Sequence, residues 1–354
     1  MKKVYIKGIG SISAQKTFDN TEFLNEIINH EENPLPVVDP TYKAYIPPAA
    51  ARRMAKGIKM GVVASKIAMN EAHVTNVDAI ITGTGLGCIK DSEKFVGAII
   101  TDNEQYLTPT SFIQSTHNTV AGQIALGIGC KGYNFTYVHA SISFESALLD
   151  TQLQLETNEA ENILVGGVDE LTQHHIDTHK LIGHVKTEPI ISSQVLNSTS
   201  KGAILAEGAN FFVLTNEKEA SNYAELIAVE TYNTLDTENL EKAATVFLKE
   251  NNLSSSDIDV VILGNNGDID FDNYYHTIGE TLFENTQQIC YKHLIGEFHT
   301  ASSFAFWLAA KILKSQSIPE EVKLNTIETS NINTILIYNQ YRGQNHSFVV
   351  LQKC

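Results

Sequence analysis

A group of glycines and a pair of histidines are the first residues that suggest a binding site. The segment ITGTGLG (81–87) resembles part of a dinucleotide-binding loop. Its third glycine is misplaced for the G-x-G-x-x-G pattern, however, and no acidic partner for a ribose is evident. His175 and His179 could share one helical face and bind a metal ion, but HHIDTH offers no third ligand. We therefore predict neither a nucleotide site nor a metal site here, and we interpret the two histidines as exposed polar residues.

Three aspartates in the second part of the chain begin like a calcium-binding loop. Asp268, Asp270 and Asp272 have the alternating spacing of the first ligands in such loops. Asn273 stands where the loop requires a glycine, and Gly279 stands where it requires a bidentate glutamate. The pattern indicates a solvated acidic loop, and we predict no metal and no cofactor for the chain.

Composition and charge limit the kinds of partner. With 354 residues, of which 43% are hydrophobic and 19% charged, the chain can bury one large core or two medium ones. Its formal net charge of −16 argues against nucleic acid and anionic membranes as partners, and an acidic carrier protein would be repelled as well. No apolar run approaches the roughly 20 residues of a membrane helix, and MKKVYIKGIGSIS alternates like a strand instead of resembling a signal peptide. Four cysteines without C-x-x-C spacing fit a reducing compartment, so we expect a cytoplasmic protein.

Strand-like and helix-like segments alternate along the chain, which is typical of an α/β protein whose sheets are covered by helices. In the first part, the patterns predict strands at 4–12, 77–83, 133–141 and 161–168, helices at 52–72 and 143–156, and two strands around a glycine turn at 201–215.

The order of elements begins again after a polar hinge, TNEKEASNY (215–223). The second part is predicted to contain strands at 224–233 and 257–263, helices at 240–252 and 298–316, and a closing pair of strands at 333–352. We therefore predict two similar halves, 1–215 and 216–354, that form one compact unit without a repeat at the residue level.

Five short motifs occur in the order in which the β-ketoacyl synthase family carries them. NTVAG (118–122), HASIS (139–143) and LVGGVDE (164–170) resemble the family's N-x-x-A-G, T-A-C-A-S/T and G-G-x-E segments. KGAILAEGANFFVL (201–214) and YRGQNHSFVVL (341–351) resemble its R-D-G-F-x-x-x-E-G-A segment and its closing G-F-G-G-T-N-x-S hairpin. This resemblance, which covers nearly the whole chain, implies a thiolase-like five-layer αβαβα fold with two halves related by a pseudo-twofold axis.

Members of this family condense acyl chains with one cysteine and two histidines. Counting back from Gly166 without gaps puts Ser141 at the position of the cysteine. The family's H-G-T loop resembles GNNGDID, with Asn266 at the histidine position. Its K-x-x-x-G-H turn resembles KHLIGEFHTAS, which keeps Lys292 but has Glu297 in place of the second histidine. The resemblance thus implies that all three catalytic positions are replaced, and we expect no catalytic residue among them.

These replacements remove the chemistry that a condensing enzyme needs. Its nucleophile is a thiolate, formed from a thiol with a pKa of about 8.5 at a helix N-terminus that favours the anion. The Ser141 hydroxyl is much harder to ionise and needs an adjacent base. Decarboxylation of the extender places negative charge on a carbonyl oxygen, which paired imidazoles stabilise by donating hydrogen bonds. Asn266 can donate one such bond, whereas an ionised Glu297 can donate none and would repel the enolate.

Each of these residues also has a purely structural interpretation. Ser141 could cap the helix that follows it, a common role for serine at such a junction. Glu297 could pair with Lys292 in a buried ion pair. His139 and His299 could hydrogen-bond within the core near the replaced centre.

Family members without the cysteine resemble chain-length factors, which pair with an active ketosynthase and limit its growing chain. We therefore predict a non-catalytic subunit that shapes the acyl tunnel of a partner in polyketide, aryl polyene or related fatty acyl synthesis. The resemblance implies pairing through the strand before Ser141, with a homodimer as the alternative, and docking of the acyl carrier protein on the partner. It also implies candidate interface or tunnel residues, which are Phe112, Gln114, His117, His139, His299 and Tyr341.

An active serine enzyme is the alternative hypothesis. Ser141 would act as an acyl nucleophile, His139 or His299 as its base, and Glu297 as the orienting carboxylate. Such a protein would be a thioester hydrolase or an acyltransferase.

Overall fold

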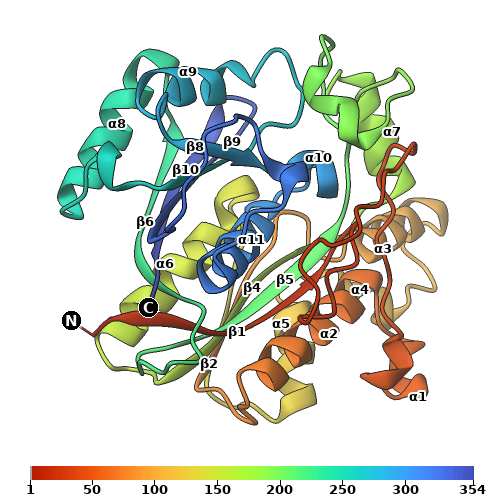
Figure 1. Cartoon of the computed structure of the whole chain (residues 1–354). Helices are drawn as coiled ribbons and strands as arrows, with labels where there is room; N and C mark the ends of the chain where they lie inside the picture. Colours follow the sequence, from red (N-terminus) through yellow and green to blue (C-terminus); the bar gives the residue numbers. More distant parts are fainter. Residues whose placement is uncertain (1) are drawn as a thin grey trace.

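The computed structural model describes residues 2–354 of the chain. Ten strands form one continuous sheet in the order β3-β2-β4-β5-β1-β6-β10-β9-β7-β8 (Figure 1). The strands are β1 (Val4–Ile12), β2 (Ala79–Gly83), β3 (Tyr133–Tyr137), β4 (Asn162–Asp169), β5 (Gly208–Thr215), β6 (Ala224–Thr234), β7 (Val260–Leu263), β8 (Gln287–Cys290), β9 (Thr334–Tyr341) and β10 (Gln344–Gln352).

The strand order divides the sheet into two half-sheets of the same design. In the first, β3, β2 and β4 run parallel, and β5 and β1 follow, each antiparallel to its neighbour. In the second, β8, β7 and β9 run parallel, and β10 and β6 follow in the same antiparallel manner. The half-sheets join where residues 4–6 pair antiparallel with residues 224–226. The strand order is therefore palindromic about this junction, as a duplicated structure requires.

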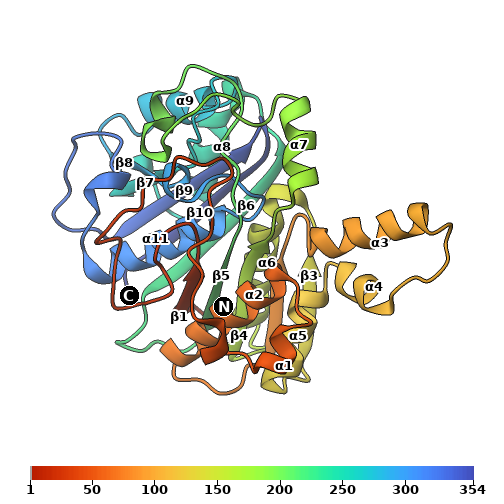
Figure 2. The same cartoon turned by 90° about the vertical axis from the view of Figure 1, so that its right-hand side faces the viewer.

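Helices fill three layers around the two half-sheets (Figures 1 and 2). The central layer holds α6 (Ser143–Glu156) and α11 (Ser302–Ser315); the outer layers hold α2 (Lys56–Glu71) with α5 (Thr119–Ile128), and α8 (Thr237–Glu250) with α9 (Asn273–Thr281). The other α-helices are α1 (Pro48–Ala51), α3 (Ile89–Thr101), α4 (Pro109–Ser115), α7 (Gln173–Leu181) and α10 (Lys292–Ile295). The predicted five-layer αβαβα architecture is confirmed.

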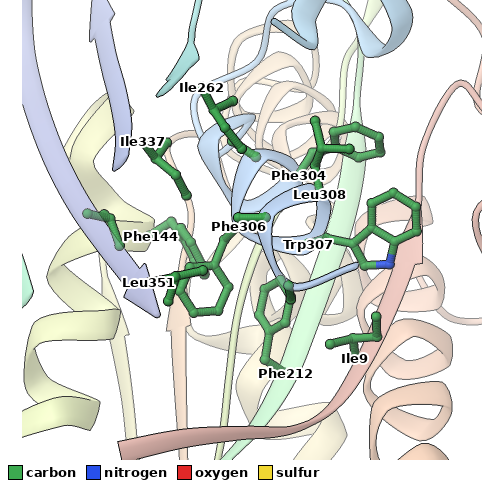
Figure 3. Close-up of a cluster of buried hydrophobic side chains, with 14 of the residues drawn as sticks. Ile9, Phe144, Phe212, Ile262, Phe304, Phe306, Trp307, Leu308, Ile337 and Leu351 are labelled. Atoms are coloured by element: carbon green, nitrogen blue, oxygen red, sulfur yellow. The ribbon is translucent and has the colours of Figure 1, made fainter. Parts of the chain in front are cut away.

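α11 lies at the centre of the core because it is largely apolar, and its one charged residue within 302–313, Lys311, is buried and donates to the Asn20 carbonyl. Residues 302–313 are all buried, and a helix without a polar face is stable only when protein surrounds it. Phe306 packs edge-on against Phe144 of α6 and Phe212 of β5, with ring centroids 5.7 and 4.8 Å apart (Figure 3). These contacts fix the two central helices against the first half-sheet, and so they fix the loops at the helix ends. Among the described residues, no helix is both long and apolar enough to cross a membrane.

One predicted strand is absent from the structure, and the strand predicted at 133–141 ends at Tyr137. Residues 208–215 form β5, but residues 201–207 do not form the strand predicted before it. Ala203 makes only an isolated bridge with Val185, and Leu205 makes one with Glu297. These partners belong to two separate loops, so no continuous ladder can form along the segment.

Candidate functional site

The predicted site residues lie on loops that connect to both half-sheets. Ser141 follows β3, Asn266 follows β7, and Tyr341 ends β9. Glu297 and His299 lie in the turn between α10 and α11. Hydrogen bonds join Ser141 to His299 and Asn266 to Glu297, so both halves of the chain contribute to one site.

Ser141 is held in a tight turn just before α6. Ala140 takes a left-handed φ of 45°, and a 3₁₀ turn leads from it into the helix. Ser141 is only 1% exposed, and its Oγ lies 2.9 Å from Nδ1 of His299. The predicted capping role is wrong for Ser141, because Ile142 is the cap residue of α6 and no side chain makes a cap hydrogen bond there. The Ser141 hydroxyl therefore faces a histidine from the other end of the site.

One carboxylate oxygen of Glu297 accepts two hydrogen bonds. Lys292 Nζ lies 2.8 Å from Glu297 Oε2, and Asn266 Nδ2 donates to the same oxygen over 2.7 Å. The Lys292 and Glu297 side chains are 0% and 3% exposed, so the structure contains the buried ion pair predicted as the structural role of Glu297. The predicted alternative, in which Glu297 orients a catalytic histidine, is wrong because this carboxylate is bonded to Lys292 and Asn266 instead.

The loop that carries Asn266 is held by buried carboxylates. Asp272 accepts hydrogen bonds from the backbone N–H groups of Asn266 and Gly267, over 3.1 and 2.8 Å, and burial raises the pKa of Asp272. Asp268 pairs with Arg342 over 2.9 Å. The prediction of a solvated loop is wrong for both aspartates, because each is buried and bonded within the chain. Within residues 2–354, no three His, Cys, Asp or Glu side chains converge on a metal-binding arrangement.

A small cavity borders this site, and α7 covers it. Tyr341, His299 and Glu297 line the cavity together with His175 and His179 of α7. Its volume of about 20 Å³ is enough for a water molecule but far below that of a ligand pocket, roughly 300–1,000 Å³. The interpretation of His175 and His179 as exposed is wrong: both are half-buried, and their rings lie 4.1 Å apart between centroids.

Burial perturbs the ionisable groups that line the cavity. It lowers the pKa of His175 to about 4, with a smaller contribution from the neighbouring His179. It raises the pKa of Tyr341 to about 12, and the Glu297 carboxylate adds to this shift. At neutral pH both groups are therefore uncharged, so neither adds a charge to the cavity wall around Glu297.

Glu145 of α6 is a buried carboxyl that the sequence motifs did not indicate. It is 1% exposed, and its Oε1 accepts a hydrogen bond from Ser347 Oγ over 3.0 Å. Burial raises the pKa of Glu145, and the nearby hydroxyls of Ser302 and Ser347, of which Ser347 donates the hydrogen bond above, offset only part of this rise. The only signal in the sequence was a glutamate in the first turn of a helix whose neighbouring positions are apolar or small.

The shifted pKa of Glu145 predicts a pH-dependent stability. A folded-state pKa above the unfolded value means that the folded protein binds the proton more tightly. The contribution of this proton binding to stability is therefore complete below about pH 4.3, the usual pKa of an unfolded glutamate. It is lost as the pH rises through the pKa of Glu145 in the folded protein. We expect Glu145→Gln to be more stable than the parent at pH 7.5 and to lose this advantage on acidification. Urea unfolding between pH 5 and 8 measures the effect, with the exposed Glu238→Gln as control; a constant difference at every pH would contradict it.

Three of the predicted interface residues lie on the exposed surface of the chain. Phe112 of α4 is 54% exposed and packs against Phe95 of α3, with ring centroids 5.2 Å apart. His117 and His139 are exposed as well. The predicted alternative role of His139 as a base for Ser141 is wrong, because the histidine that the structure places beside Ser141 Oγ is His299.

Gln114 has a different environment from the other predicted interface residues. Its Oε1 accepts a hydrogen bond from the Ala55 backbone N–H over 2.9 Å, and its Nε2 donates to the Arg53 carbonyl. The side chain thus fastens α4 to the turn before α2 in its own chain. A direct role for its amide in an acyl tunnel would require breaking both bonds.

The sequence matches one protein-family model. Residues 13–220, more than half of the chain, match the model described as "Beta-ketoacyl synthase, N-terminal domain". Among curated proteins, none matches the sequence.

Solved structures share the fold over the full length of the chain. A β-ketoacyl synthase from Burkholderia phymatum STM815 has a TM-score of 0.83 at 16% identity, and 100% of both chains is covered. The ishigamide ketosynthase/chain length factor has a TM-score of 0.81 at 15% identity, with 100% of this chain and 99% of that chain covered. The ketosynthase ApeO in complex with its chain length factor ApeC, from Xenorhabdus doucetiae, has a TM-score of 0.78 at 16% identity, with 100% and 98% covered. The predicted thiolase-like fold is confirmed by these similarities.

Proposed function

The chain belongs to the β-ketoacyl synthase family, and from this membership we propose that it is a non-catalytic subunit that pairs with an active ketosynthase and shapes its acyl tunnel. The polyketide or aryl polyene class of pathway is the proposed context. Two of the structures that share the fold are named as combinations of a ketosynthase with a chain length factor.

The observation that carries the proposal is the hydrogen bonding at the positions where the family resemblance places the catalytic residues. Condensation needs a thiolate and free donors that point at the charge developing on the extender. Position 141 offers a hydroxyl, and both Asn266 and Lys292 donate to the Glu297 carboxylate. The two hydrogen-bond donors, Asn266 and Lys292, are thus already bonded within the chain. The negative charge of Glu297 would also repel an enolate.

An exposed apolar edge supports the pairing. β3 is an edge strand of the sheet, and Tyr133, Phe135 and Val138 on or just after it are exposed. Leu149 and Leu153 of α6, which packs beside β3, are exposed too. We call these five residues the β3 patch. An uncovered edge strand with large apolar side chains is a template for association with another chain.

α3 and α4 extend the surface around the β3 patch. Figure 2 shows both helices projecting from the body beside β3. They expose a second set of apolar side chains, which are Val96, Ile100, Phe112 and Ile113. A partner bound at the β3 patch would lie within reach of this projection, which makes Phe112 the best candidate for a side chain that borders the partner's tunnel.

The charge of the chain supports docking of the carrier protein on the other subunit. Acyl carrier proteins are acidic and bind to basic surfaces, and this chain has a formal net charge of −16. We expect the isolated chain to bind an acyl carrier protein much more weakly than the paired ketosynthase does. A titration that gave equal affinities would contradict this division of roles.

Co-expression with a candidate ketosynthase tests the function. The expected result is a one-to-one complex on size-exclusion chromatography that elongates malonyl-carrier substrates, whereas this chain alone does not. Phe112→Ala should shift the products toward longer chains because it removes a large side chain from the proposed tunnel border. Val246→Ala, which truncates an exposed side chain on α8, is the matched control. An unchanged product distribution in an intact Phe112→Ala complex would exclude the tunnel role of Phe112.

One observation favours the serine enzyme as a second candidate function. The 2.9 Å separation of Ser141 Oγ and His299 Nδ1 is the contact that a nucleophile and its base require. Thioester hydrolysis by the isolated chain, lost in Ser141→Ala, would support this candidate. A parent protein without such activity would remove it.

A further inference from the structure

His299 lies between Ser141 and the small cavity. Its Nδ1 is 2.9 Å from Ser141 Oγ, and its ring lies 5.3 Å from the Tyr341 ring between centroids. The ring also packs on the backbone of Gly85, where an added Cβ would come within 2.3 Å of it. His299 lines the cavity, whereas Ser141 is not among the residues that do. The imidazole thus lies between the hydroxyl and this cavity.

Asp169 fixes the imidazole in this position from two sides. Its Oδ2 accepts hydrogen bonds from the backbone N–H and the hydroxyl of Thr300, the residue after His299, both over 2.9 Å. Its Oδ1 accepts from the backbone N–H groups of Gly85 and Leu86, over 2.8 and 3.0 Å. One buried carboxylate therefore holds both the chain that carries the ring and the loop on which the ring rests.

A group attached to residue 141 would need the volume that His299 fills. The cavity on the other side of the ring offers only about 20 Å³. Closely packed interiors do not open without displacing side chains. The identity of residue 141 alone therefore does not decide whether this site can hold an acyl group.

We propose that His299 is the specificity-determining residue that closes this chain's own acyl site, so that in the pair the growing chain can be held only in the partner's site. The closure of the site is inferred from the contacts of His299 and the small volume of the cavity. The consequence for the pair rests on the proposed function. Restoring a nucleophile at position 141 would then be insufficient to restore acylation, because the imidazole still occupies the space.

Thiol labelling of the isolated full-length chain tests the closure. Ser141→Cys and the double variant Ser141→Cys/His299→Ala are exposed to methyl and octyl methanethiosulfonate, which form a mixed disulfide with a thiolate and release methanesulfinate. Peptide mass spectrometry then measures the label at position 141. Because the reactivity of a thiol follows its accessibility, we expect the double variant to be labelled at least about tenfold faster than Ser141→Cys. The increase in labelling rate should be larger for the octyl reagent than for the methyl reagent.

Two controls separate closure by His299 from a general loosening of the protein. Ser141→Cys/His175→Ala removes another histidine that lines the cavity and should label as slowly as Ser141→Cys. The exposed Cys354 reports reagent activity, and the buried Cys290 must stay unlabelled in every variant. Fast octyl labelling of Ser141→Cys itself, or equal rates in all folded variants, would overturn the proposal. The assay needs no ketosynthase, so its failure is distinct from a failure to form the pair.

Discussion

Lys292→Met is expected to lower the free energy of unfolding by about 3–5 kcal/mol, because it leaves the Glu297 carboxylate buried without its counter-charge. Methionine has a similar length and fills most of the vacated space. The loss of stability therefore reflects the unpaired carboxylate and not a cavity. Asn266 would remain as the single donor to Glu297, and one neutral hydrogen bond does not replace an ion pair. Urea unfolding at pH 7 gives the change.

The double variant Lys292→Met/Glu297→Leu tests whether the unpaired carboxylate causes the loss of stability. Removing both charges replaces the ion pair with apolar side chains, which is often nearly neutral for stability. We therefore expect the double variant to recover most of the loss. Lys16→Met breaks an exposed pair with Glu22 and should change the stability by no more than about 0.5 kcal/mol. A double variant as unstable as Lys292→Met would show that the loss comes from packing.

Phe135→Asp is expected to weaken pairing with the ketosynthase by at least about 30-fold, which corresponds to about 2 kcal/mol. Phe135 lies at the middle of β3, between Tyr133 and Tyr137, with ring centroids 6.0 and 4.9 Å away. A carboxylate there would be buried without a partner in any complex that covers the β3 patch. Condensation by the mixture should fall with the population of the complex, as measured by analytical ultracentrifugation and by product formation.

Val246→Asp is the matched control for Phe135→Asp. It introduces the same charge at an exposed apolar residue of α8, on the outer layer of the second half-sheet. We expect unchanged pairing and unchanged thermal stability for this variant. If both variants pair normally, the β3 patch is not the interface, and the proposed pairing must use another surface.

The fold was more predictable from the sequence than the site. The strand predicted at 4–12 and the helix predicted at 143–156 coincide with β1 and α6. Both have strong local patterns, and local patterns decide such elements. Residues 201–207 were predicted as a strand by the same criterion, but their partners are Val185 and Glu297, which no local pattern reveals.

At the site, the order of motifs identified Ser141, Asn266 and Glu297 as residues that the fold brings near one another. It did not identify the residues that approach from outside those motifs. His175 was misinterpreted because the exposure of a helix face depends on where α7 packs, which is a tertiary property. Glu145 was missed because the cost of burying a carboxyl appears only when the surrounding helices and strands are in place.

The two hydrogen bonds of Gln114 have a consequence for association kinetics. Because they join α4 to residues 53–55 of the same chain, the position of the α3–α4 projection is set when the chain folds. A partner that docks on this surface then meets a preorganised shape instead of a segment that must be ordered on contact. Less conformational entropy is lost at that step, so encounter complexes can mature without waiting for a rare conformation of the projection.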